Sequence, residues 1–166
     1  MTTHFHVTID TQLGYMRPVS DGKFLIRLDW DQSPFSAPDN PDDVSRETSD
    51  QLIAYLGGSL KNFRLPIRAE GKSATGQAWL EAMSDIPYGV VVTYAEFAAA
   101  AGRPGAPRAA GSACSTNPIP IIYPCHRVVR AGGALGNYGG GSSLDPKHPA
   151  NLARKQSLID LERRFA

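Results

Sequence analysis

The stretch NPIPIIYPCHRVV, residues 117–129, carries the strongest information in this sequence. An apolar run marked by prolines leads directly into Cys125, His126 and Arg127. A buried cysteine usually acts as a small apolar residue, but a cation beside a thiol lowers the pKa of the thiol and favours the nucleophilic thiolate. The stretch therefore predicts an active-site strand that presents Cys125 as a nucleophile.

The histidine after this cysteine indicates how the thiol would lose its proton. Adjacent residues in an extended segment point to opposite faces, so we expect no direct hydrogen bond between Cys125 and His126. A water relay is more plausible, and it needs a carboxylate that holds the tautomer of His126. The nearest acids downstream are Asp145, Asp160 and Glu162.

The segments around this stretch predict a mainly helical region. Residues 93–96 (TYAE) read as a capping box that begins a helix, which Gly102 ends. After a glycine turn, residues 106–114 predict a second short helix rich in small residues, so that the pair has the outline of a helix-turn-helix. A polar loop at 142–151 precedes a closing helix at 152–165.

Residues 1–70 have a different pattern. Residues 24–30 alternate with the period of a strand, and Asp21-Gly22 predicts a hairpin from an earlier strand near residues 5–9. A helix follows from about residue 44, with Leu52, Ile53 and Leu56 on one face, and Pro66 confines a strand at 63–67 to a sheet edge.

These elements predict an α/β protein of the α+β type with two domains. The first, residues 1–70, is a small accessory α+β domain with an antiparallel sheet. The second, residues 71–166, is mainly helical and holds the helix-turn-helix and the active-site strand.

The charges are distributed unevenly between these two parts. Residues 1–70 carry ten acids and seven bases, a net charge of −3, whereas residues 71–166 carry six acids and ten bases, a net charge of +4. No acid occurs between Glu96 and Asp145, which suits either a solvated basic face or a polyanionic partner.

The two cysteines exclude a disulfide scaffold, and a reducing compartment is the natural environment for them. The sequence has neither a secretory signal nor an apolar run long enough for a membrane helix, so we expect a cytoplasmic protein without a membrane partner. His4 and His6 share a strand face, but we interpret them as an incidental surface pair and predict no metal site.

Residues 117–129, together with Asn137-Tyr138-Gly139-Gly140-Gly141 and Arg108-Ala109-Ala110-Gly111, strongly resemble the O6-alkylguanine-DNA alkyltransferases. The resemblance covers about residues 75–165, and it includes Ile86-Pro87-Tyr88-Gly89 and Thr93-Tyr94. Residues 1–70 fit the accessory domain of that family by layout only.

The resemblance implies a role for each matching residue. Cys125 would accept the alkyl group, with His126 as a base acting through water and Glu162 as the carboxylate that orients it. We prefer Glu162 to Asp160 from the match of the closing helix, although the loop at 142–151 is an insertion relative to the family. Asn117 would brace the turn beside the nucleophile, and Tyr94 would donate a proton to guanine N3.

The same resemblance implies a DNA-binding surface and a substrate pocket. Arg108 would enter the duplex in place of the extruded nucleotide, while the small residues Ala109, Ala110 and Gly111 would let their helix enter the minor groove. Arg103 and Arg130 are expected to contact phosphates. The pocket would be formed by Val128, Tyr138, Gly139 and Pro120.

The implied function is DNA repair by irreversible, single-turnover transfer of an alkyl group from O6-alkylguanine, and less strongly from O4-alkylthymine, to Cys125. Double-stranded DNA would be the partner of a monomeric protein, and no cofactor is expected. The main alternative is a non-catalytic damage sensor related to this family, in which tryptophan typically occupies the acceptor position. A helix-turn-helix regulator and a cysteine hydrolase rank lower, because each leaves part of the pattern unexplained.

Overall fold

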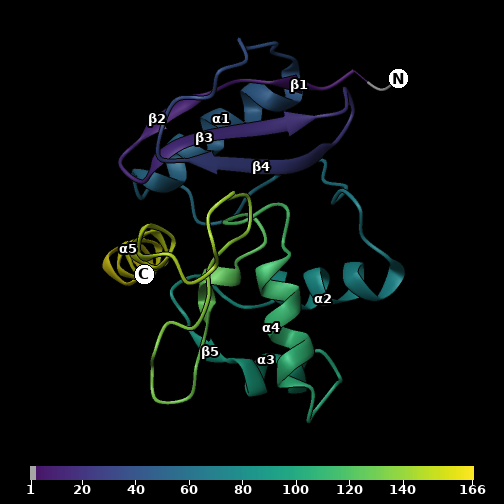
Figure 1. The fold of residues 1–166 in the computed structure, drawn as a ribbon, viewed down its shortest axis with the longest axis vertical. Coiled ribbons are helices and arrows are strands. Elements are labelled where there is room, and N and C mark those ends of the chain that lie inside the picture. The colour runs from purple at the N-terminus through teal and green to yellow at the C-terminus, as the bar shows by residue number, and fades with distance from the viewer. Residues whose placement is uncertain (1–2) are drawn as a thin grey trace.

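The computed structural model of this chain describes residues 3–166 and contains an antiparallel sheet stacked on a mainly helical part (Figure 1). The sheet is formed by β1 (Phe5–His6), β2 (Ile9–Thr11), β3 (Gly14–Ser20) and β4 (Leu25–Asp31). β4 pairs along one edge of β3, while β1 and β2 share the other edge. The mixed α+β fold class predicted from the sequence is confirmed.

The hairpin at Asp21-Gly22 is confirmed, but its first strand is β3 and not the segment at residues 5–9. Pro18 lies in the middle of β3 and cannot donate a backbone hydrogen bond. Because β1 pairs with residues 19–20 and β2 with residues 14–16, Pro18 faces the gap between these two short strands. A proline is therefore compatible with this central strand.

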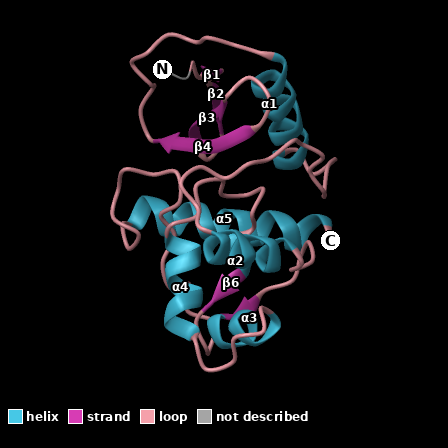
Figure 2. Ribbon diagram, turned by 90° about the vertical axis from the view of Figure 1, so that its right-hand side faces the viewer, coloured by secondary structure: helices cyan, strands magenta, loops and turns pink. Residues whose placement is uncertain are grey.

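Helix α1 (Asp43–Leu56) packs against the sheet (Figure 2). Asp42 and Ser45 form its capping box, and the helix ends at Gly57. The predicted apolar face needs a correction, because Ile53 is 56 % exposed and Tyr55 is fully buried instead. Tyr55 and Leu52 lie one turn apart and point into the same core.

The helical part contains α2 (Ala74–Ser84), α3 (Tyr94–Ala100), α4 (Pro107–Ser115) and the closing helix α5 (Pro149–Phe165), which begins three residues earlier than predicted. Thr93 and Glu96 form the predicted capping box at α3. Helices α3 and α4 contact each other as the predicted helix-turn-helix pair. Two short strands, β5 (Val92–Thr93) and β6 (Val128–Val129), pair in parallel.

The segment that leads to Cys125 is not the predicted active-site strand. Ile121 has a left-handed φ of 74°, and Cys125–Arg127 form a single 3₁₀ turn, η1, directly before β6. Pro118, Pro120 and Pro124 lack the N–H groups that a ladder requires, so the chain turns instead of extending. The predicted edge strand at 63–67 is likewise reduced to one bridge between Ile67 and Leu25.

The sheet and the helical part share one continuous hydrophobic core. The edge of β4 also bonds directly to the loops of the helical part, through Leu28 N to Pro118 O at 2.8 Å and Trp30 N to Gly141 O at 2.7 Å. These bonds cover a strand edge that would otherwise be open. They also place the sheet against the loops on either side of Cys125.

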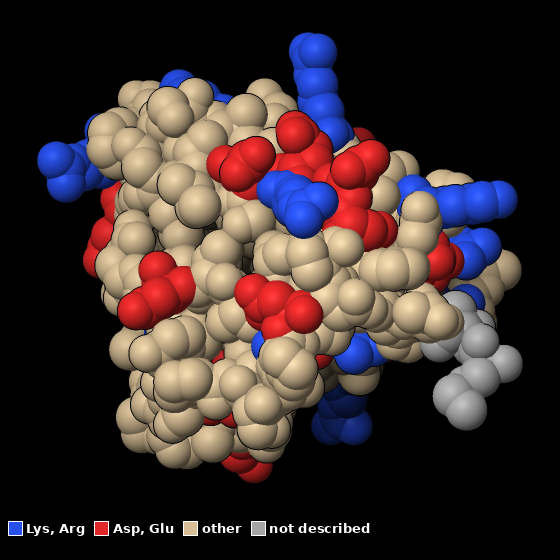
Figure 3. Space-filling model, turned by 90° about the horizontal axis from the view of Figure 1, so that it is seen from above, with Lys and Arg blue, Asp and Glu red and all other residues tan. Residues whose placement is uncertain are grey.

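Acidic side chains gather on the sheet side of the molecule, which is the face in Figure 3. This distribution agrees with the net charge of −3 in residues 1–70. Within residues 3–166, no helix combines the length and hydropathy that crossing a membrane requires. The same residues contain no cluster of three or more metal-ligating side chains.

Candidate active site

Cys125 begins the 3₁₀ turn η1 and is only 1 % exposed. Asn117 holds the segment that leads into this turn, because its Nδ2 donates to Tyr123 O at 2.8 Å and its Oδ1 accepts from Ile119 N at 3.0 Å. The same Nδ2 lies 3.2 Å from the Sγ of Cys125. Asn117 therefore contacts both the nucleophile and the segment directly before it.

The pKa of Cys125 is raised, not lowered as the neighbouring cations suggested. Burial raises it, and the hydrogen bond from Asn117 and the charges of Lys155 and Arg154 offset this effect only in part. The thiol is thus protonated in the resting protein, so its ionisation requires a base.

His126 is fully buried and forms a 2.6 Å hydrogen bond between its Nε2 and the Oε2 of Glu162. Glu162 comes from α5, and among the three acids considered it is the one that the fold brings to His126. Asp160 is exposed, and its carboxylate accepts from Nε2 of Gln156, one turn earlier on α5. The acid that the helix register from residue 152 to residue 162 favoured is therefore the one that contacts His126, and its role in the reaction stays a prediction.

Glu162 is surrounded by donors. Arg127 donates from Nε to Oε1 at 2.8 Å and from Nη2 to Oε2 at 2.9 Å, and Gly89 N donates to Oε1 at 3.0 Å. Burial alone would raise the pKa of Glu162, but the hydrogen bonds from His126 and Arg127 outweigh it and hold this pKa well below its usual range. Glu162 is consequently an ionised, acceptor-only group at neutral pH.

This pairing determines the tautomer of His126. An ionised carboxylate accepts, so the proton of the neutral imidazole lies on Nε2 and the lone pair on Nδ1. Nδ1 is buried, and no group within residues 3–166 forms a hydrogen bond with it. Burial lowers the pKa of His126 more than Glu162 raises it, so the ring is neutral and can act as a base.

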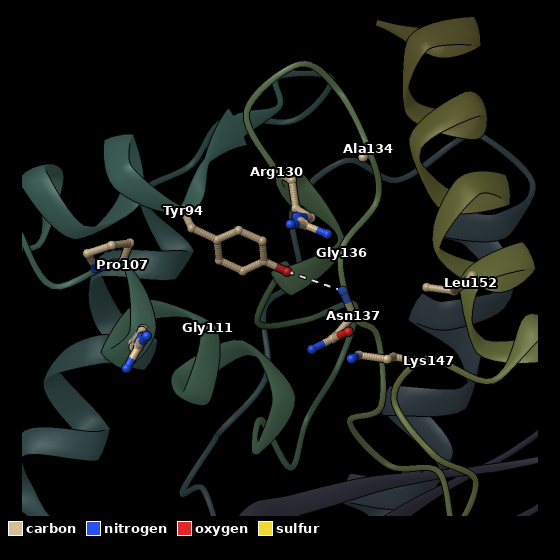
Figure 4. A pocket seen from close by; sticks show the side chains of 10 residues that line it. Tyr94, Pro107, Gly111, Arg130, Ala134, Gly136, Asn137, Lys147 and Leu152 are labelled. Carbon is tan, nitrogen blue, oxygen red and sulfur yellow. Dashed lines mark hydrogen bonds between the residues drawn. The ribbon is translucent and has the colours of Figure 1, made fainter.

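A cavity of about 740 Å³ opens between α3, α4 and the loop that follows β6 (Figure 4). Its charged lining residues are Arg108, Arg130 and Lys147, all of them basic. Figure 4 shows the ring of Tyr94 pointing from α3 toward Asn137, whose backbone N–H donates to the phenol oxygen at 3.5 Å. Such a cavity suits an aromatic ligand attached to phosphates.

Tyr94 is a proton donor at physiological pH. Burial is the largest cause that raises its pKa, to about 12. Tyr94 directly follows β5, which pairs with β6, and β6 directly follows the turn that holds Cys125, so this side of the cavity adjoins the element that presents the nucleophile.

The predicted DNA-binding residues lie on or beside the helix-turn-helix. Arg108 and Ala109 are exposed on the first turn of α4, Ala110 is buried against the core, and Gly111 lines the cavity. Arg103 stacks on Trp79, with its guanidinium 5.7 Å from the ring centroid.

The four residues predicted to form the substrate pocket do not line this cavity. Val128 and Tyr138 are buried in the same core as Cys125, Gly139 is buried against Pro146, and Pro120 is buried beside Gly141. Their contact with substrate stays a prediction.

Two buried residues contact the site or the cavity loop and were not predicted from the sequence. Lys155 donates from Nζ to the carbonyl oxygens of Val128, Leu135 and Asn137. These bonds connect β6 to the loop that follows it and lines the cavity. The position of Lys155 seven residues before Glu162, on the same helix face, is a signal that could have revealed it. Tyr55 bonds Glu162 from 107 residues away, and no local pattern indicates that contact.

Fold and site together define an α+β protein in which a helix-turn-helix adjoins a buried cysteine–histidine–glutamate cluster. The family model described as "6-O-methylguanine DNA methyltransferase, DNA binding domain" matches residues 74–164. The chain therefore belongs to the 6-O-methylguanine DNA methyltransferase family.

Full-length relatives and solved structures agree with this assignment. The chain is 36 % identical to a methylated-DNA–protein-cysteine methyltransferase of Mycolicibacterium paratuberculosis, over 96 % of this chain and 92 % of that protein. The crystal structure of the Mycobacterium tuberculosis O6-methylguanine methyltransferase matches with a TM-score of 0.80 and 32 % identity, and covers 99 % of this chain and 95 % of that one. The M. tuberculosis protein in complex with DNA matches with the same TM-score and 34 % identity, over 98 % and 94 % of the two chains.

Proposed function

We propose that this protein repairs duplex DNA by moving an alkyl group from O6 of alkylguanine to the Sγ of Cys125. The observation that carries this proposal is the buried Cys125 directly before a neutral His126 whose Nε2 is held by Glu162. The names of the relatives and the family match support the same reaction.

The reaction begins with a proton transfer. Nδ1 of His126 takes a proton from a water molecule, which in turn takes the proton of the Cys125 thiol. The thiolate attacks the alkyl carbon in line, so a sulfur–carbon bond forms while the carbon–oxygen bond breaks. The electron pair of the broken bond stays on the purine oxygen, and Tyr94 donates a proton to N3 to neutralise the departing base.

The product explains why one molecule would act once. A thioether has no easy route back to the thiol, so the acceptor is consumed. O4-alkylthymine contains the same kind of alkyl–oxygen bond, and we propose it as a second, less favoured substrate.

The alkyl group sits inside a stacked base pair, so the nucleotide must leave the stack before Cys125 can reach it. We propose that α4 enters the minor groove, where its small residues Ala109 and Gly111 permit close approach, and that Arg108 fills the vacated space. Arg103 and Arg130 would contact phosphates beside it. The acidic sheet side of Figure 3 lies away from α3 and α4 and does not oppose this docking (Figures 1 and 3).

We further propose that the protein acts as a monomer in the cytoplasm, where a reducing environment keeps Cys125 free. Residues 1–70 would form the accessory domain and residues 71–166 the DNA-binding and alkyl-acceptor domain.

The test is the intact mass of the protein after incubation with a methylated duplex oligonucleotide. We expect one added methyl group, on the peptide that contains Cys125. Cys125→Ser should bind the duplex and gain no mass, whereas Cys114→Ser should be methylated like the wild type. Methyl on Cys114, or repeated turnover, would refute the mechanism, and binding by the wild type without any mass gain would favour the damage sensor.

A further inference from the structure

We infer that Tyr55 is a positioning residue for the reaction. It lies on helix α1 of the sheet part, which comprises β1–β4 and α1, and it orients the Glu162–His126 pair for proton transfer. The hydroxyl of Tyr55 donates to Oε2 of Glu162 at 2.6 Å and lies 3.4 Å from Nε2 of His126. Tyr55 is 0 % exposed. This inference rests on the proposed function, because it assigns Tyr55 to the same proton transfer.

Three donors converge on one oxygen of the Glu162 carboxylate. Oε2 of Glu162 accepts from Tyr55, from His126 and from Nη2 of Arg127. Each additional donor withdraws negative charge from that oxygen, so it becomes a weaker acceptor for the others. The Tyr55 hydroxyl thereby limits how strongly Glu162 pulls on the proton of His126.

The phenol is suited to this role because it stays protonated. Burial and the charge of Glu162 raise the pKa of Tyr55 far above its usual value. Its hydroxyl therefore stays protonated, and able to donate, across the neutral pH range.

The sign of the effect on His126 follows from the groups around it. Glu162 raises the pKa of His126, whereas burial and the positive charges of Arg127 and Lys155 lower it. Removing the Tyr55 hydroxyl leaves more negative charge on Glu162 for the imidazolium, so the pKa of His126 rises. A histidine that protonates more readily is lost as a base at a higher pH.

The origin of these groups gives the sheet part a function in catalysis. Arg127 and His126 come from η1, and Glu162 and Lys155 come from α5. Tyr55 alone among these five comes from α1, 107 residues before Glu162. The sheet part would therefore complete the active site as well as cover it.

A merely structural role for Tyr55 is the competing explanation, and the structure offers a matched control. The Tyr55 ring packs against Phe63 at 5.3 Å and Tyr88 at 6.2 Å between centroids, and phenylalanine preserves this packing. Tyr88 also has a buried hydroxyl, but within residues 3–166 it has no hydrogen-bond partner. Tyr88→Phe therefore removes a neighbouring hydroxyl without touching Glu162.

The first experiment is an NMR titration of His126 in the DNA-free protein labelled with ¹⁵N-histidine. In the wild type we expect a neutral ring with the proton on Nε2. Tyr55→Phe should raise the midpoint of His126 protonation by about one pH unit, the order of a single hydrogen bond to a charged group. Tyr88→Phe should leave the midpoint in place, and an equal midpoint in all three proteins, or a ring that stays neutral in all until acid unfolding, overturns the inference.

The second measurement is the rate of single-turnover transfer against pH, with free benzylguanine and with duplex substrate. The acid side of the pH–rate profile should shift to higher pH in Tyr55→Phe, by the same amount as the midpoint of His126 protonation, on both substrates. The affinity for unmodified DNA should not change. An unshifted profile would contradict the inference.

The NMR titration separates the inference from the proposed function. The titration needs no alkyl transfer, so it decides the role of Tyr55 even if no protein gains mass. If Tyr55→Phe does not fold, the wild type still gives an answer. A slowly exchanging Tyr55 hydroxyl proton close to the His126 ring supports the bond, and its absence refutes it.

Discussion

The exchange of Glu162 for glutamine tests the centre of the site, because it removes one charge and keeps the shape of the side chain. The Glu162 carboxylate is 2 % exposed and its partner Arg127 is 9 % exposed, so the pair is almost fully desolvated. Breaking a buried pair by removing one partner costs about 3–5 kcal/mol. At about 2–4 °C per kcal/mol for a chain of this size, the melting temperature should fall by about 6–20 °C.

The reaction should suffer more than the fold. A glutamine amide presents donors to a site where the ring of His126, the hydroxyl of Tyr55 and the guanidinium of Arg127 already donate. The His126 tautomer is then no longer held, and loss of an oriented base reduces the rate by about 10²- to 10⁴-fold. We expect this loss on free benzylguanine and on duplex DNA alike.

The assay is single-turnover transfer with protein in excess, at a temperature where calorimetry shows the variant to be folded. Asp160→Asn is the control, because Asp160 is exposed on the same helix and its carboxylate accepts from Gln156 and not from the site. Its stability should stay within about 0.5 kcal/mol of the wild type. If Asp160→Asn proves the more damaging change, or if Glu162→Gln transfers at the wild-type rate, the assignment of the carboxylate is wrong.

Three further outcomes are expected. Arg108→Ala should slow transfer on duplex DNA far more than on free benzylguanine, even at saturating DNA, because unstacking costs a few kcal/mol and the flipped state becomes less populated. In the control Arg103→Ala, saturating DNA should restore the wild-type rate. If saturation restores the rate of both variants, Arg108 is a phosphate contact. Tyr94→Phe should lower the single-turnover rate by about tenfold or more, because the purine loses its proton donor. Since burial raises the pKa of Tyr94 to about 12, ionisation of this phenol should not reduce the wild-type rate up to pH 10. An equal rate in the variant and the wild type would exclude the donor role. The pKa of Glu162 is depressed in the folded state, so its contribution to stability is present above the unfolded value near 4.5 and is lost as the pH falls below it. Urea unfolding from pH 7 to pH 3 should therefore show that the difference in the free energy of unfolding between wild type and Glu162→Gln becomes smaller with acid. A constant difference would contradict this linkage.

The sequence by itself determined the elements whose cause is local. The capping box of Thr93 and Glu96, the turn at Asp21-Gly22 and the helix register that puts Glu162 on the buried face of α5 all depend on residues a few positions apart. Interactions of this range act on any chain with the same letters, so they can be predicted before the fold is known. The family motifs around Cys125 have the same property, since they occupy consecutive positions.

Only the tertiary structure decided how these pieces become a site. The sequence pattern predicted a strand before Cys125, whereas the structure has a left-handed Ile121 and a 3₁₀ turn, with Asn117 bonded to Tyr123 O, Ile119 N and Cys125 Sγ. The raised pKa of Cys125 follows from complete burial, which no neighbouring residue reveals. Tyr55 reaches Glu162 because the sheet part packs on the helical part, and a contact across 107 residues depends on the global arrangement of the chain and leaves no mark in the local sequence.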